Sequence, residues 1–209
     1  SLGVLAPPSD YGADIICGDV QPLGVHMNCG GGLGGFIASR DEMKYVGEYP
    51  THLISIAQTQ REGEYGFGYC RYDRTSYIAR EKAKDWVGTG TALWTIAAAN
   101  YLALMGPQGM KEVGEAILQK SHYAAKRLAE IRGVRILFPT FFKEFVVNFD
   151  KAKKSVPSVN KALLRQGAFG GKDLTNEFPE LGRSALYAVT EVHSRDAIDR
   201  LVEAMRRVI

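Results

Sequence analysis

The sequence has few cysteines, and their arrangement does not predict a metal site. Among 209 residues there are only Cys17, Cys29 and Cys70. They form no CxxC pair, and no histidine stands near them at the spacing of a zinc site. We therefore expect no metal, and we interpret the three residues as buried or free thiols in a reducing compartment.

Long apolar runs and an excess of one charge are also missing. No run reaches the roughly 18 residues that cross a bilayer, and the N-terminus lacks a basic segment followed by an apolar stretch. The 26 Lys and Arg residues are offset by 23 Asp and Glu residues, and the densest basic cluster is confined to 151–154. Because basic and acidic residues are scattered along the chain, the sequence lacks the basic patch that is typical of a nucleic-acid-binding protein. We expect a cytoplasmic protein with neither a membrane nor a nucleic acid as partner.

The first half of the chain has the residue pattern of an α/β sheet. With 45% hydrophobic residues the chain can form a core. Apolar residues at 13–17 predict a buried strand, the glycines at 30–35 predict a loop, and 35–39 predicts a second strand. The polar stretch 40–74 follows, in which the residues around 66–68 favour an extended or hairpin element.

The second half alternates helices and strands. Good helix formers at 92–105 carry apolar residues on nearly every face, which predicts a largely buried helix that stops at Gly106 and Pro107. The next helix, 107–132, is amphipathic. The remaining expected elements are strands at 134–138, 145–149 and 185–190 and helices at 158–166 and from Ser194. This order predicts a small α/β layer covered by helices on one side, and domains at 1–106 and 107–209.

The glycine run formally matches GxGxxG through Gly30, Gly32 and Gly35. In a dinucleotide-binding fold these glycines must open a helix whose N-terminus meets the pyrophosphate. Here they lead directly into the strand expected at 35–39. We interpret the run as a tight loop between sheet elements.

A second glycine-containing segment, 88–91, stands immediately before a helix. Free backbone N–H groups and two hydroxyls could receive a phosphate there. Simple capping of the helix by Thr89 or Thr91 explains the same residues. The sequence leaves both interpretations open.

The remaining polar residues form no recognisable catalytic group. The four histidines, His26, His52, His122 and His193, are isolated from one another and from any nucleophile motif, so no triad can be assembled. We expect each to be structural or exposed. Arg74, with the charged residues at 80–82, is typical of a short helix on an ordinary surface.

Several stretches together resemble the P-protein of the glycine cleavage system, especially its non-catalytic subunit 1. Their order and spacing extend over the whole chain, whereas members of that family are considerably longer. The matching stretches are 1–8 with 11–15, 18–24, 77–83, 97–106, 188–191 and 198–202.

The resemblance implies a fold-type I, aminotransferase-like pyridoxal-phosphate (PLP) fold: the last part of a large α/β domain followed by the small C-terminal domain. In the family's catalytic subunit a His-Lys pair supplies the lysine that holds PLP as a Schiff base. Alignment with that pair puts Gln21 at the histidine and Pro22 at the lysine. Since proline has no amine, the resemblance implies a subunit that binds no PLP covalently and that lacks a catalytic residue of its own.

The resemblance also implies a supporting role in a heteromer of dimeric or higher order. The partners would be a catalytic subunit 2, which carries PLP and decarboxylates glycine, and the lipoyl carrier protein that receives the aminomethyl group. The loop expected to reach the partner's site extends over 80–91. Its candidate residues toward the cofactor or partner are Arg80, Lys82, Thr89, Gly90 and Thr91.

The chain departs from the family pattern at 84–91, where it keeps only part of the family's polar residues. It also departs at 51–65 and at Asn28 and Cys29 of the glycine loop, and these two departures are consistent with a diverged subunit or with a paralogue that has another partner. Two rival functions stay open. One is a self-sufficient PLP enzyme, an aminotransferase or desulfurase, although no lysine lies between Ser1 and Asp41. The other is a non-catalytic scaffold that uses the fold only for dimerisation.

Overall fold

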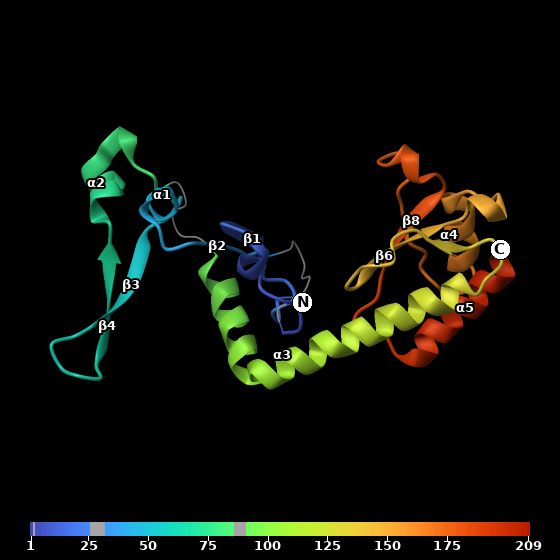
Figure 1. Ribbon diagram of the computed structural model, residues 1–209, viewed down its shortest axis with the longest axis horizontal. Helices are drawn as coiled ribbons and strands as arrows, with labels where there is room; N and C mark the ends of the chain where they lie inside the picture. Colours follow the sequence, from blue (N-terminus) through green and yellow to red (C-terminus); the bar gives the residue numbers. More distant parts are fainter. Residues whose placement is uncertain (2, 26–31, 86–90) are drawn as a thin grey trace. The chain divides into compact units, whose positions relative to one another are not determined.

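The computed structural model describes residues 1, 3–25, 32–85 and 91–209 (Figure 1). Contacts divide the chain into a first unit, Ala6–Met105, and a second unit, which joins Ser1–Leu5 to Gly106–Ile209. The domains predicted at 1–106 and 107–209 stay a prediction about the family. The two units differ from these domains at residues 1–5. These residues join the second unit because the backbone of Gly3 lies against that of Met110.

The second unit is a four-stranded antiparallel sheet with helices. The sheet has the order β5-β6-β8-β7. Phe145 of β6 pairs with Tyr187 of β8, and Val147 pairs with Ala185. The elements of this unit are the second part of α3 (Ala92–Ala129), β5 (Arg135–Ile136), β6 (Glu144–Asn148), α4 (Val156–Leu164), β7 (Lys172–Asp173), β8 (Ser184–Ala188) and α5 (Arg195–Val208).

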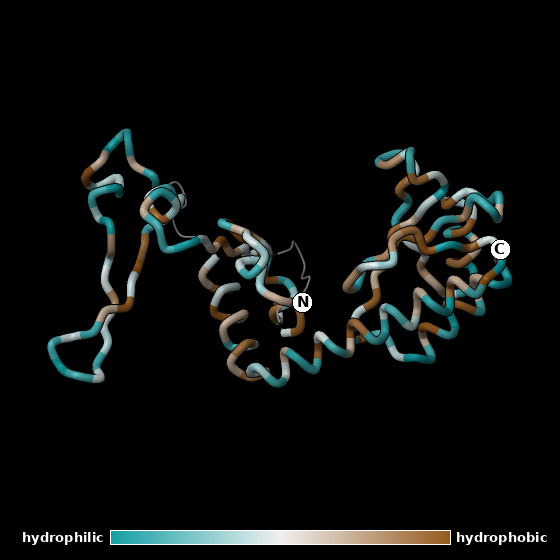
Figure 2. The backbone as a smooth tube through the Cα atoms, viewed as in Figure 1, coloured by the Kyte–Doolittle hydropathy of each residue, from teal (hydrophilic) through white to brown (hydrophobic). Residues whose placement is uncertain are grey.

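One hydrophobic core holds this unit together. Successive strand residues point to opposite faces, so Phe145 and Val147 lie on the same face of β6 and join the core. The helices contribute Leu128 from α3, Leu163 from α4 and Met205 from α5, all of them inaccessible to solvent. Figure 2 shows hydrophobic backbone segments gathered along these strands and helices. The small α/β layer predicted from the sequence is confirmed.

The helices of the second unit follow local signals. Ser194 caps α5, since its hydroxyl accepts a hydrogen bond from the backbone N–H of Ala197 at 3.1 Å. α4 begins two residues earlier than expected, with Pro157 in its first turn, where a missing N–H costs nothing. The two-residue strand β7 was not predicted, because so short a strand has no periodicity to detect.

The helix over 92–105 ends as predicted, but its burial was predicted wrongly. Gly106, at φ 61° and ψ −179°, interrupts the helical dihedrals within α3. Ala98 is buried, whereas Leu93, Ile96 and Leu104 expose 69%, 59% and 87% of their surface. Gly24 lies against Tyr101 and Gly32 lies against Trp94, so the preceding turn and the glycine loop pack on part of this helix and leave these three residues exposed.

The first unit contains two separate antiparallel strand pairs. β1 (Ile15–Asp19) pairs with β2 (Gly35–Ser39), and β3 (Leu53–Gln58) pairs with β4 (Tyr65–Cys70). The hairpin expected around Gly66–Gly68 is confirmed. The buried strand expected at 13–17 is corrected: it begins at Ile15 and is mostly exposed, because it belongs to a two-stranded ribbon.

Short helices connect these strands. The α-helical turns are α1 (Met43–Val46) and α2 (Ser76–Ala79). Single 3₁₀ turns lie at Pro8–Tyr11, Tyr72–Arg74 and Arg80–Lys82. The last two frame α2 and place the candidate loop residues directly after it.

Candidate functional site

Gln21 and Pro22 lie in a turn that directly follows β1. The Asp19 carboxylate accepts a hydrogen bond from the backbone N–H of Gln21 at 2.9 Å. The N–H of Leu23 donates to the carbonyl of Val20 at 2.9 Å, which closes the turn. Pro22 is exposed and carries no amine. The residues at this position therefore do not fit a covalently bound PLP group.

The glycine loop packs against the turn and against the start of α3. A Cβ atom built on Gly34 would lie 2.9 Å from a methyl of Val20 and 3.3 Å from the hydroxyl of Thr91. Gly32 lies so close to the Trp94 ring that a Cβ atom there would overlap it. The described part of the loop thus needs glycine for close packing, in agreement with the interpretation as a tight loop. Gly30 and Gly31 lie outside the described residues.

Thr91 contacts the glycine loop and directly precedes α3. Its carbonyl accepts hydrogen bonds from the backbone N–H of Thr95 at 3.0 Å and from the Thr95 hydroxyl at 3.2 Å. Thr89 and Gly90 lie outside the described residues. Of the candidate loop residues that the structure describes, Thr91 lies against the glycine loop, whose Gly34 also packs on Val20 at the start of the turn.

Arg80 and Lys82 form the ends of a single 3₁₀ turn, and both side chains are exposed. Arg80 has φ 51°, a left-handed value that is uncommon for a residue with a side chain. No hydrogen bond or ion pair in the described part of the chain joins Arg80 or Lys82 to Thr91 or to the turn around Pro22. Two cationic side chains, separated by Glu81, are thus exposed to solvent at this turn.

Asp85 anchors the segment that follows these cations. Its carboxylate accepts from the backbone N–H and the hydroxyl of Ser76 at 2.8 and 2.7 Å. His52 Nε2 lies 3.2 Å from the same carboxylate. The hydrogen bonds from Ser76 lower the pKa of Asp85 below its usual value. The histidine is structural, as expected from the sequence.

Arg74 was predicted to lie on an ordinary surface, and this prediction is wrong. Only 7% of this residue is exposed. Its guanidinium donates to the carbonyls of Gly47 at 3.0 Å and Thr51 at 2.8 Å, while the buried Nη2 has no partner among the described residues. Both carbonyls lie more than 20 positions away in the sequence, so no local pattern could have indicated this role.

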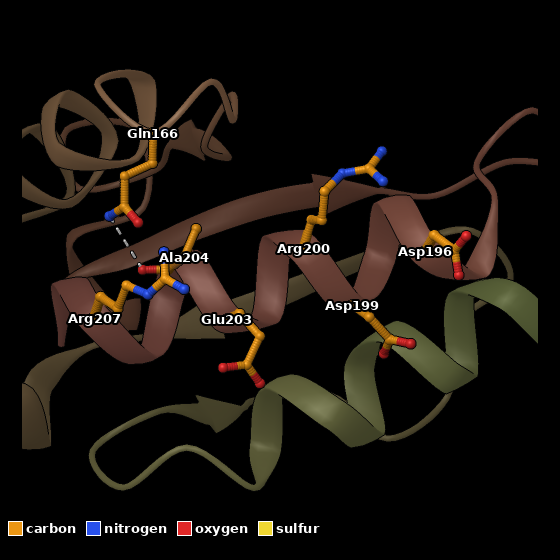
Figure 3. A pocket seen from close by; sticks show the side chains of 7 residues that line it. All are labelled: Gln166, Asp196, Asp199, Arg200, Glu203, Ala204 and Arg207. Atoms are coloured by element: carbon orange, nitrogen blue, oxygen red, sulfur yellow. Dashed lines mark hydrogen bonds between the residues drawn. The ribbon is translucent and has the colours of Figure 1, made fainter.

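A hollow in the second unit is lined by residues other than the candidate loop residues. Asp196, Arg200, Glu203 and Arg207 line it along α5, with charges of both signs (Figure 3). Asp199, which also lines it, already accepts hydrogen bonds from the Tyr123 hydroxyl and the Arg127 guanidinium of α3. The carboxylate of Asp199 is therefore engaged in structural pairing.

Two kinds of site are absent where the structure describes the chain. No group of three or more His, Cys, Asp or Glu side chains could hold a metal ion there. No helix within the described residues is long and apolar enough to cross a membrane. Cys17 is exposed and Cys70 partly buried, and both are free thiols.

Sequence comparisons match the chain to one family. The family model of the glycine cleavage system P-protein matches residues 1–205. A probable glycine dehydrogenase (decarboxylating) subunit 1 of Staphylothermus marinus is 42% identical over 210 residues, which are 100% of this chain and 45% of that protein. Its counterpart in Moorella thermoacetica is 41% identical and is covered to 46%. The chain spans slightly less than half the length of these relatives.

Solved structures agree on the fold. A crystal structure of glycine decarboxylase (P-protein) of the glycine cleavage system, in inhibitor-bound form, matches with a TM-score of 0.84 and 36% identity, covering 100% of this chain and 46% of that one. A cysteine desulfurase from Escherichia coli matches at 0.63 with 13% identity, covering 96% of this chain and 47% of that one, which supports the fold alone.

The resemblance and the fold-type I PLP architecture expected from the sequence are thereby confirmed. The match extends across both units, including the turn that carries Pro22. The chain belongs to the P-protein family of the glycine cleavage system.

Proposed function

We propose that this chain is part of subunit 1 of a glycine dehydrogenase (decarboxylating) and supports glycine decarboxylation without forming a covalent bond to PLP. One observation carries the proposal: the turn after β1, where the family's catalytic subunit has its lysine, contains exposed Pro22 instead. The names of the relatives in Staphylothermus and Moorella support the same assignment.

The catalytic partner then supplies the lysine. PLP held there would supply the electron sink for the loss of glycine's carboxylate, and a lipoyl carrier protein would receive the aminomethyl group. This chain contributes binding and positioning. Its own lysines all lie beyond residue 41, outside the turn and the glycine loop.

The loop over 80–91 is the part of this chain proposed to reach the partner's site. Arg80 and Lys82 offer two exposed cations, which suit the carboxylate of a substrate or the phosphate of a cofactor. The hydrogen bonds from Ser76 to Asp85 hold the segment in place after these cations. Thr89, Gly90 and Thr91 are proposed to complete the loop at the start of α3.

The experiment compares the protein that carries this chain alone and with a lysine-bearing P-protein subunit. Release of labelled carbon dioxide from glycine, with the lipoyl carrier protein present, measures the reaction. We expect no release by the protein alone and release with the partner. Activity of the protein alone would contradict the proposal.

Two further measurements separate the rival functions. Borohydride reduction after incubation with PLP, followed by peptide mapping, should find no pyridoxyl-lysine in this protein. A modified lysine would favour the self-sufficient enzyme. Stable self-association without any complex with the lysine-bearing subunit would favour the scaffold.

A further inference from the structure

The hairpin of β3 and β4 presents an apolar face that lacks a cover in the described part of the chain. The register pairs Ile54 with Tyr69, Ile56 with Phe67 and Gln58 with Tyr65. Since side chains alternate along a strand, these six residues share one face. Five of them are large and apolar or aromatic, and each exposes between 62% and 79% of its surface.

Aromatic rings extend this face beyond the end of the hairpin. Tyr69 contacts Tyr72 edge-on at 6.2 Å between ring centroids, and Tyr72 stacks on Tyr77 at 5.7 Å. His52 contacts both Tyr69 and Tyr77. We call the surface formed by Ile54, Ile56, Tyr65, Phe67, Tyr69, Tyr72 and Tyr77 the aromatic face.

The size of the aromatic face matches that of a stable protein interface. Aromatic side chains cover roughly 150–250 Å² each when buried, so the exposed fractions correspond to a surface on the order of 800 Å². A standard interface buries about 800 Å² on each partner, whereas exposed apolar patches of monomers rarely exceed a few hundred Å². An interface of ordinary size is therefore available on this hairpin.

The composition of the hairpin and its marginal stability indicate what kind of surface covers the aromatic face. Neither β3 nor β4 contains a charged residue, although exposed edge strands are usually protected by lysines or other charges. A two-stranded hairpin alone is marginally stable in water, and packing on an apolar surface stabilises it. The covering surface should then be largely apolar, and the part of the binding that the aromatic face contributes should depend little on salt.

The closeness of the aromatic face to the loop 80–91 in the sequence indicates which protein covers it. The aromatic face ends at Tyr77, only three residues before Arg80, which begins the loop proposed to reach the catalytic partner. A protein that receives Arg80 and Lys82 in its site must lie within reach of Tyr72 and Tyr77. We infer that the aromatic face docks on an apolar surface of the lysine-bearing subunit. This inference rests on the function proposed above.

The test compares a double variant with a matched control. Ile56→Gln together with Phe67→Gln removes the central register pair of the aromatic face. Phe169→Gln changes an equally exposed phenylalanine, 86% accessible, in the second unit. Affinity for the lysine-bearing subunit is measured by surface plasmon resonance with the whole protein that carries this chain, at low and high salt.

We expect the double variant to bind on the order of a hundredfold more weakly, because two central apolar anchors are lost. The control should bind like the wild type. Both variants should keep the wild-type circular dichroism and thermal midpoint when free, because the altered side chains are exposed.

Each other outcome has a defined meaning. If the wild type forms no complex with the lysine-bearing subunit, the proposed function fails and the docking partner with it. If the complex forms and the double variant binds equally well, the docking inference alone fails. Loss of self-association without loss of this complex would assign the aromatic face to a second copy. A lower thermal midpoint of the free double variant would assign it to a cover within the same polypeptide. Both results overturn the inference.

Discussion

Asn148 offers a sharp test of what stabilises the second unit. It is the last residue of β6, only 2% exposed, and pairs with Ser184 of β8. Its amide nitrogen donates to the Ser184 hydroxyl at 3.1 Å, the Leu181 carbonyl at 3.0 Å and the Asp150 carboxylate at 2.9 Å. Its amide oxygen accepts from the backbone N–H of Asp150 at 3.2 Å.

Asn148→Val removes all four contacts while it keeps a strand-forming side chain. Not every former partner is left without a bond. The Leu181 carbonyl still accepts from the Ser184 hydroxyl, and the exposed Asp150 carboxylate can bind water. The main loss is the acceptor of the Asp150 N–H, together with the donor to Ser184. We therefore expect a decrease of about 2 kcal/mol in the free energy of unfolding.

Hydrogen exchange of the β6 and β8 peptides is the suitable assay. Both tryptophans, Trp86 and Trp94, precede residue 106, so their fluorescence is a poor probe of this unit. A decrease of about 2 kcal/mol corresponds to exchange roughly 30-fold faster where amides exchange through unfolding. Asn176→Val, in an exposed turn, is the control and should change stability by less than about 0.5 kcal/mol. Exchange of the Asn148 variant within twofold of the wild type would refute the reasoning.

The same variant should show a defined pH dependence. The hydrogen bond from Asn148, followed by that from the Arg183 N–H, lowers the pKa of Asp150 below its usual 3.8. A carboxyl with a lowered folded-state pKa contributes stability above its unfolded pKa and loses it as pH falls through the folded value. The variant lacks the largest cause of that shift. Its deficit in stability relative to the wild type should therefore narrow as pH falls below about 3.8.

Two further predictions concern buried side chains. Phe149→Ala removes a core ring with no solvent exposure and should lower the free energy of unfolding by about 3–5 kcal/mol, whereas Phe169→Ala, at an exposed ring, should change it by less than about 0.5 kcal/mol. Chemical denaturation followed by circular dichroism measures both, and equal effects would contradict the assigned core. Arg74→Met removes the donors to the Gly47 and Thr51 carbonyls, so exchange of the amides at 47–49 and of Thr51 should become about tenfold faster or more. Unchanged exchange there would show that Arg74 does not hold this segment.

Residue patterns predicted the second unit better than the first because its signals are local. In α5 the spacing of Ile198, Val202 and Met205 puts them on one buried face, and Ser194 caps the helix as its position before the helix indicates. Gly106 ends the preceding helical stretch because glycine adopts φ values that other residues avoid. These outcomes depend on residues within one or two turns of each other.

The first unit shows why burial cannot be predicted in the same way. The apolar residues of 92–105 predicted a buried helix, yet Leu104 exposes 87% of its surface. Hydropathy records that a face is apolar, but whether another element covers it depends on segments distant in the sequence. The same limit hid Arg74, whose two carbonyl acceptors lie 27 and 23 positions away.

For the candidate site, the sequence alone determined the chemistry, and the tertiary structure decided the arrangement. Proline at position 22 has no amine in any conformation, so the absence of the family's lysine there follows from residue identity. Packing of Gly34 against Thr91 and the ring contacts that build the aromatic face arise only when separate segments meet in space. Residue identity sets which bonds a side chain can form, whereas its partners and exposure are set by the folded chain around it.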